Sequence, residues 1–197
     1  MLRFIRTSPF IQLATADANG LPYVSPKGDE PGFVQVEMDD GRGVALLVPD
    51  RPGNRLLFGL QNVLEGSGRV GLLFEVPGNC HTLRCGGVAA VSRDPSLLRR
   101  FAARGRDAKM VLRVRVDYAF FHCAKAYLRS RLWEPDTWPA PGACEVTFGR
   151  YFTRQTLAVD AIDAEVSAEY AAVRAAVEDG HAEPDYDLST PTPLMAR

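Results

Sequence analysis

Cysteine and histidine are scarce in this chain, which has four cysteines and three histidines among 197 residues. The cysteines are irregularly spaced, and no secretory h-region is recognisable at the N-terminal end. We therefore expect reduced thiols and a cytoplasmic location rather than a disulfide framework. Cysteine and histidine do occur close together at 80–85 and 122–123, but their spacing matches no closed zinc or haem motif. Scattered core cysteines are the favoured interpretation.

An excess of charge and a long apolar run are also lacking. Lys and Arg number 23 against 24 Asp and Glu, so the net charge is -1. No apolar run approaches the roughly 18 residues needed to span a bilayer. Neither nucleic acid nor a membrane is therefore an expected partner. The chain also lacks a nucleophile elbow, a catalytic triad pattern and carboxylates paired at an informative spacing.

Short apolar or alternating runs predict a meander of strands. The turn pair Asn19-Gly20 tolerates positive φ, and it separates the first two runs. Strands are predicted over 10–16, 22–25, 33–38, 44–48, 70–76, 82–91 and 110–116. Many short strands with interspersed helices indicate an α+β, mainly β, barrel. Because a small barrel has little room inside, a ligand is expected on its outer wall or at a subunit interface.

Helical periodicity appears in four places. Apolar residues three and four apart predict a helix over 54–65, and Asp94 followed by Pro95 predicts an N-cap that begins a helix ending at Gly105. Two further helices are predicted over 122–130 and 162–178. We interpret 1–138 as the barrel domain, 139–180 as a C-terminal connection with a helix packing on the barrel, and 181–197 as a flexible tail.

The segment SPKGDEPGFV contains the first candidate binding residues. Strand alternation places Tyr23, Ser25 and Lys27 on one side, and the predicted helix start offers free backbone N–H groups near Asn54 with Arg55 in its first turn. A hydroxyl, two cations and a helix N-terminus are the parts of a phosphate site. From spacing alone, a solvated loop with an ordinary surface arginine explains the same residues.

A second cluster of candidates lies in HCAKAYLRS. On a helix, His122, Lys125 and Arg129 would fall at i, i+3 and i+7 and form one stripe of potential cations. Such a stripe could bind an acidic substrate. A solvated helix face is an equally good interpretation.

The order of several longer segments resembles a known family. The run SPFIQLATADANGLPYVSPKGDEPGFVQV is followed by LLVPDRPGN, NVLEGSGRVGLLFEVPG, TLRCGGVA and FFHCAKAYLRSRLW. This order, over roughly Phe4 to Trp138, resembles the pyridoxamine 5'-phosphate oxidase-like flavoproteins, and in particular a bacterial subgroup of FMN-binding or PPOX-class proteins. The substrate-binding pattern of the true oxidases near the C-terminus is not recognisable, so pyridoxamine phosphate is not the expected substrate.

The resemblance implies an FMN-binding split barrel, a six-stranded Greek-key barrel with flanking helices that forms a homodimer and acts as an oxidoreductase. FMN would lie between the subunits, and a small-molecule substrate or electron donor would react with it. Lys27 and Arg55 would hold the phosphate, Ser25, Asn54 and Asn62 would support it, and Arg84 would contact the ring. The stripe of His122, Lys125 and Arg129 could stabilise the reduced, anionic flavin. Relatives on this barrel also use the deazaflavin F420 or bind haem. An F420-dependent reductase and a non-catalytic flavin- or haem-binding protein therefore remain alternatives.

Overall fold

The computed structural model describes residues 1–39, 43–51, 57–140, 142–143 and 159–180. These residues belong to two compact units. The first comprises Met1–Ala102 and Asp107–Asp136, and the second comprises Ala103–Arg106 and Thr137–Arg197. No helix in the described ranges has both the length and the apolar character needed to cross a membrane.

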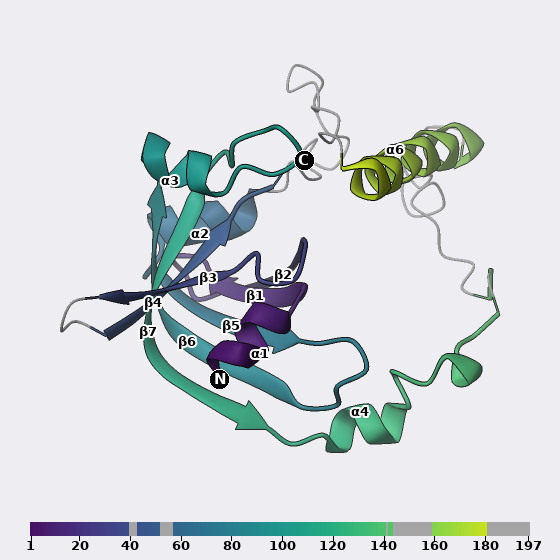
Figure 1. Cartoon of the computed structure of the whole chain (residues 1–197), viewed down its shortest axis with the longest axis horizontal. Helices are drawn as coiled ribbons and strands as arrows, with labels where there is room; N and C mark the ends of the chain where they lie inside the picture. The colour runs from purple at the N-terminus through teal and green to yellow at the C-terminus, as the bar shows by residue number, and fades with distance from the viewer. Residues whose placement is uncertain (40–42, 52–56, 141, 144–158, 181–197) are drawn as a thin grey trace. The chain divides into compact units, whose positions relative to one another are not determined.

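A seven-stranded antiparallel sheet forms the first unit, so the sheet has one strand more than the six implied by the resemblance. Its strand order is β2-β1-β5-β6-β7-β4-β3, and β2 and β3 are its two edges. The strands are β1 Phe10–Ala16, β2 Pro22–Gly28, β3 Gln35–Asp39, β4 Gly43–Pro49, β5 Arg69–Glu75, β6 Thr82–Ser92 and β7 Val111–His122. Figure 1 shows β6 and β7 as the longest strands, and they curve together.

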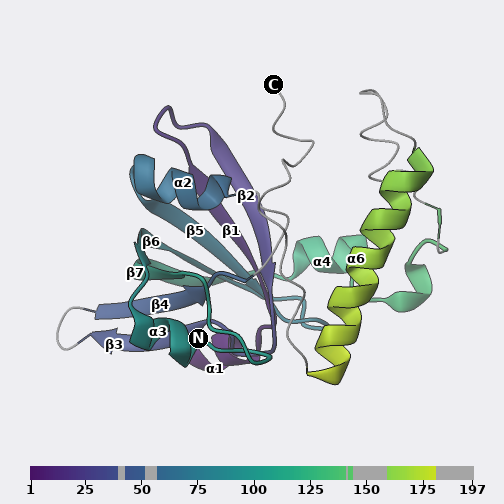
Figure 2. The ribbon, with the colours of Figure 1, turned by 90° about the horizontal axis from the view of Figure 1, so that it is seen from above.

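The curved sheet surrounds one main apolar core. Alternate residues of the central strands point into it, including Leu13, Leu72 and Leu83, which are at most 2 % exposed. Three short helices flank the sheet: α1 Leu2–Thr7, α2 Phe58–Glu65 and α3 Pro95–Arg100. Helix α2 lies over β1 and β2 (Figure 2) and contributes Leu60 and Val63 to the core. The sequence prediction of a mainly β, α+β architecture is therefore confirmed.

Strand β4 shows how the sequence pattern encodes burial on two faces. Its run GVALLVP is almost continuously apolar, and its last five residues are buried. Leu46 and Val48 point into the main core, whereas Leu47 packs on the other side against Phe101 and Val111 beneath α3. A continuous apolar run, rather than an alternating one, is what a strand covered on both faces requires.

Turn and cap signals in the sequence are confirmed. The Asp17 carboxylate accepts hydrogen bonds from the backbone N–H groups of Asn19 and Leu21, and Gly20 has a φ of 84°. The Asp94 carboxylate accepts hydrogen bonds from the backbone N–H groups of Ser96 and Leu97, which caps α3. That helix ends at Arg100, five residues before the predicted Gly105.

The prediction for the 110–130 region was wrong in one respect. Strand β7 continues through His122, and the following helix, α4, spans only Lys125–Ser130. Every residue from Thr82 to Ser92 has a partner in β7, so the long β6 ladder keeps the chain extended past Val116. The sequence YAFFH contains strong strand formers, which favour this outcome. A 3-10 turn, Pro135–Thr137, follows α4.

The second unit contains α6, Val159–Asp179, which confirms the helix predicted over 162–178. Its hydrophobic positions recur at helical spacing, and Ala176 is buried while Tyr170 is exposed. The tail predicted over 181–197 lies outside the described residues. The domain boundaries at 138 and 180 remain predictions.

Candidate functional site

The strand that carries the candidate residues Ser25 and Lys27 is present as β2. Tyr23, Ser25 and Lys27 are its half-buried positions, and Val24 and Pro26 between them are exposed. The segment from Ser25 to Gly28 is therefore strand and not a solvated loop. Ser25 lies opposite Leu13 of β1, which points into the core. Alternation thus places the three side chains on the α2 side of the sheet, as predicted.

Lys27 has an acidic neighbour that the sequence did not reveal. Its Nζ lies 3.5 Å from Asp50 Oδ1, and both side chains are mostly buried. Nearby in sequence, Arg51 Nε donates to Asp29 Oδ2 at 2.6 Å, and Arg51 Nη1 donates to the Phe101 carbonyl oxygen. Asp29 is only 3 % exposed as a side chain. Two ion pairs therefore lie where the β2 and β4 strands end, and an anion bound by Lys27 would compete with Asp50.

The helix expected to begin near Asn54 is first described at Phe58, with Leu57 as its N-cap residue. The described helix N-terminus is thus four residues later than predicted. Asn54 and Arg55 lie outside the described residues. Asn62 lies on α2, and its amide Nδ2 donates to Thr15 Oγ1 at 3.0 Å. A Cβ at Gly59 would lie 3.9 Å from Ser25 Oγ, so Ser25, Asn62 and Thr15 gather beneath α2.

His122, Lys125 and Arg129 do not form the predicted helix stripe. His122 is the last residue of β7 and pairs with Thr82, because the strand continues past the predicted helix start. Lys125 and Arg129 are one helical turn apart on α4 and share a face. All three side chains are exposed.

Arg84 points to the opposite face of the sheet from Ser25. Register places Ser25, Leu13, Leu72 and Cys85 in one row across four strands, and Arg84 is the neighbour of Cys85. Because successive side chains of a strand alternate, Arg84 projects from the outer face. Within one chain, the candidate phosphate-binding residues and Arg84 therefore lie on opposite faces of the sheet and do not contact the same small ligand.

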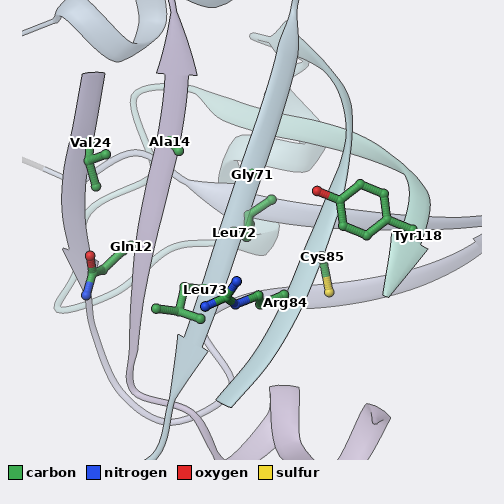
Figure 3. A pocket seen from close by; sticks show the side chains of 9 residues that line it. All are labelled: Gln12, Ala14, Val24, Gly71, Leu72, Leu73, Arg84, Cys85 and Tyr118. Atoms are coloured by element: carbon green, nitrogen blue, oxygen red, sulfur yellow. The ribbon is translucent and has the colours of Figure 1, made fainter. Parts of the chain in front are cut away.

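An open pocket of about 250 Å³ surrounds Arg84 on this outer face (Figure 3), and we call it the outer shelf. Its floor is made of small or apolar residues from neighbouring strands, and Arg84 and Gln12 supply polar groups at one end. The lining residues are Gln12, Ala14, Val24, Gly71, Leu72, Leu73, Arg84, Cys85 and Tyr118. Of these residues, only Arg84 was predicted from the sequence to contact a ligand.

Tyr118 forms one wall of the outer shelf. Its ring lies over Gly86, the residue opposite it in β6, and a Cβ at Gly86 would be 2.3 Å from Tyr118 Cζ. Glycine at this position is what lets the ring lie flat across the strand. Tyr118 also stacks with Phe120, with ring centroids 5.8 Å apart. Val24, Tyr118 and Phe120 remain 56 %, 54 % and 44 % exposed, so this face presents apolar surface to solvent.

The polar end of the outer shelf is organised by Glu75, a buried residue at the end of β5. Gln12 Nε2 donates to Glu75 Oε1 at 2.9 Å. Burial raises the pKa of Tyr127 to about 12, with further increases from a hydrogen bond to Glu75 and from its negative charge, which outweigh the opposing Arg84 guanidinium. Tyr127 in turn stacks on Trp133, with centroids 5.9 Å apart. The α4 segment therefore reaches the end of the shelf.

Metal-binding clusters are not found in the described part of the chain, where no three His, Cys, Asp or Glu side chains are grouped to hold an ion. Cys80, Cys85 and Cys123 are free thiols. Cys85 is 2 % exposed, and this burial raises the pKa of its thiol to about 11. Its burial fits the core interpretation of that cysteine.

The family model of the pyridoxamine 5'-phosphate oxidases matches residues 1–123, which is more than half of the chain. The chain belongs to this family. Together with the observed sheet, this match confirms the α+β split-barrel fold predicted from the sequence resemblance. None of the curated proteins compared with the chain matches it.

Solved structures to which the chain is similar include HupZ of Group A Streptococcus, at 18 % identity over 61 % of this chain and 90 % of that one, with a TM-score of 0.48. A candidate pyridoxamine 5'-phosphate oxidase of Lactobacillus delbrueckii is 22 % identical over 60 % of this chain and 88 % of its own, with a TM-score of 0.44. HutZ, the haem storage protein of Vibrio cholerae, is 17 % identical over 60 % of this chain and 89 % of its own, with a TM-score of 0.38.

Proposed function

We propose that the protein is an FMN-binding oxidoreductase whose flavin lies between two copies of the chain. The observation that carries this proposal is the outer shelf, where a flat apolar floor lies beside one cation, Arg84. No described residue forms an ion pair with Arg84, so its guanidinium is available to a ligand. A planar ring with a polar, electron-rich edge fits such a surface. Hydride chemistry at the ring would be supplied by the flavin when it is bound.

Two arguments support a dimer. The shelf of one chain, at about 250 Å³, is below the range of about 300–1,000 Å³ typical of ligand pockets. The apolar side chains around it are also more exposed than a monomer needs, which is typical of a surface that another chain covers. A second copy would complete the pocket and bury this face.

The two groups of candidate residues fit the same arrangement. Ser25, Lys27 and Asn62 lie on the α2 side of the sheet and Arg84 on the outer side, so one copy would hold the FMN phosphate while the other contacts the ring. Asn54 and Arg55 complete the proposed set of phosphate-binding residues. The exposed cations lie at the end of β7 and on α4, and they are His122, Lys125 and Arg129. The protein's own residues would bind and orient the flavin, and the organic substrate or electron donor would react at the exposed ring.

The phosphate assignment is tested by Lys27→Ala combined with Arg55→Ala. Each charge-assisted hydrogen bond to phosphate contributes about 1.5–3 kcal/mol, so losing both should weaken FMN binding by at least about 100-fold. Arg93→Ala with Arg99→Ala, two exposed cations near α3, is the matched control. Flavin fluorescence titration gives the affinity, and light scattering after size-exclusion chromatography gives the oligomeric state. A double variant that keeps full flavin occupancy would show that the phosphate site is elsewhere.

A further inference from the structure

Two neighbouring ion pairs join the end of β2 to the chain that follows β4. The β2 end contributes Lys27 and Asp29, and the chain after β4 contributes Asp50 and Arg51. Each segment thus supplies one cation and one anion, and the four charges cancel. The two pairs differ in length, in burial and in the number of their other hydrogen bonds, and this difference assigns them different roles.

The pair of Asp29 and Arg51 is tightly built. Arg51 Nε donates to Asp29 Oδ2 at 2.6 Å, and the Glu30 backbone N–H donates to Asp29 Oδ1 at 2.9 Å. Arg51 Nη1 donates to the Phe101 carbonyl oxygen at 2.6 Å, and the Asp29 backbone N–H donates to the Pro9 carbonyl oxygen at 3.1 Å. Opening this pair would leave a charge almost buried without its partner, which is strongly unfavourable. We therefore expect it to stay closed.

The pair of Lys27 and Asp50 is loose by comparison. Its 3.5 Å separation exceeds the roughly 2.7–2.9 Å of a strong charge-assisted hydrogen bond, and its side chains are 23 % and 14 % exposed. Within the described ranges, Lys27 is the one side chain paired with the Asp50 carboxylate. The Asp50 backbone N–H donates to the Met110 carbonyl oxygen at 2.9 Å, which keeps this carboxylate beside Lys27. Such a pair can open when a stronger anion arrives.

A phosphate monoester is a stronger anion than a carboxylate. It has up to two negative charges and three acceptor oxygens, so it can bind the Lys27 ammonium more closely than Asp50 does. The fixed Asp50 carboxylate would then lie near a ligand of its own sign, and like charges repel. Binding therefore gains one ion pair, loses another and adds a repulsion.

From this geometry we infer that Asp50 is a built-in competitor for Lys27, which the phosphate of the ligand displaces, and that Asp50 thereby weakens the binding of phosphate-bearing ligands. The pair of Asp29 and Arg51 holds the two segments together while Lys27 exchanges its partner. The inference rests on the proposed function and deepens it, since it concerns what limits the affinity of the proposed phosphate site.

The test compares FMN with riboflavin, which has the same ring and no phosphate. Asp50→Asn keeps the shape of the side chain and removes its charge. The full-length protein is freed of bound pigment, and both affinities are measured by fluorescence quenching. We expect Asp50→Asn to bind FMN about five- to tenfold more tightly than the wild type does, because Lys27 is released and the repulsion is gone. Riboflavin affinity should not change, and Asp50→Ser should act in the same direction.

Asp29→Asn is the matched control, because it removes the same charge from the neighbouring pair. It leaves Arg51 without its carboxylate, so the melting temperature should fall. The ratio of FMN to riboflavin affinity should not rise in this variant. Both variants change the net charge of the protein equally, so a general electrostatic attraction for FMN would raise the ratio in both.

The outcomes separate this inference from the function on which it rests. A ratio that rises in Asp50→Asn and not in Asp29→Asn would support the competitor role. An unchanged or lower ratio in Asp50→Asn, or an equal rise in both variants, would overturn that role and leave FMN binding intact. A wild-type protein that binds FMN no better than riboflavin would overturn both the competitor role and the phosphate assignment. A protein that binds neither flavin would overturn the proposed function and this inference together.

Discussion

Two adjacent glycines in β6 should respond very differently to alanine. At Gly86, the new Cβ would lie 2.3–2.5 Å from three atoms at the end of the Tyr118 side chain. At Gly87, it would lie 1.9 Å from the Arg115 carbonyl oxygen and 2.9 Å from its carbon, and both are backbone atoms of β7. The ladder is irregular between these glycines, with a register shift in the pairing to β7. Side chains can rotate away, whereas backbone can move only by opening the sheet.

The magnitudes follow from these contacts. Tyr118 must retreat by more than 1 Å to reach an ordinary carbon contact of about 3.5 Å, and it is half exposed, so Gly86→Ala should cost less than about 1 kcal/mol. Gly87→Ala must separate β6 from β7, which costs about 1–3 kcal/mol in overpacking and about 1 kcal/mol for each weakened ladder hydrogen bond. At about 2–4 °C per kcal/mol for a chain of this size, a loss of about 3 kcal/mol lowers the melting temperature by roughly 6–12 °C.

Thermal melts followed by circular dichroism measure both variants against the wild-type chain. Gly86→Ala should melt within about 4 °C of the wild type, yet bind flavin more weakly because the Tyr118 wall of the outer shelf has moved. Gly87→Ala should melt much lower. Equal melting temperatures for the two variants would refute the reasoning, as would a Gly87→Ala protein as stable as the wild type.

Two further predictions concern titratable side chains. Cys85 is buried and its pKa is raised to about 11, so iodoacetamide at pH 8 should alkylate the exposed Cys123 long before Cys85. Peptide mapping by mass spectrometry measures the two alkylation rates. Comparable rates for the two cysteines would contradict the burial of Cys85. Burial is the largest single influence on the pKa of Glu37 and raises it, but the hydrogen bonds and charges of Arg113 and Arg100 together outweigh burial and hold that pKa below its ordinary 4.5. Because its pKa is lowered, ionised Glu37 stabilises the fold above pH 4.5, and this stabilisation is lost as the pH falls further. The difference in melting temperature between the wild type and Glu37→Gln should therefore shrink below about pH 4.5. A constant difference from pH 7 to pH 3 would contradict the assignment.

Local sequence patterns predicted most of the fold. Strand β1 has the predicted bounds, a strand is present at 44–48 as predicted, and the turn at Gly20 and the cap at Asp94 are present. The end of β7 could not be predicted in the same way. Its last residues, Tyr118 to His122, are extended because residues 82–86 of β6 pair with them, and each partner is 32 to 40 residues away along the chain. Periodicity in HCAKAYLRS alone favoured a helix and contained no information about the ladder.

The candidate site was predictable only in part. The position of Arg84 on an outward-facing strand position followed from its alternation with Leu83 and Cys85. The roles of Gln12 and Glu75 depend on the register between β1 and β5, and on α4 reaching Glu75 with Tyr127. Neither relation is local in the sequence. Gln12 does interrupt the apolar run of β1, and this is the one signal that could have drawn attention to it.

The central claim is that this family member binds FMN. The most direct test is to purify the full chain without added cofactor, record its visible spectrum, denature it and identify any released pigment by mass spectrometry. We predict FMN at close to one molecule per chain, or its stoichiometric uptake when FMN is added. Release of F420 or haem instead, or a colourless protein that does not take up FMN, would contradict it.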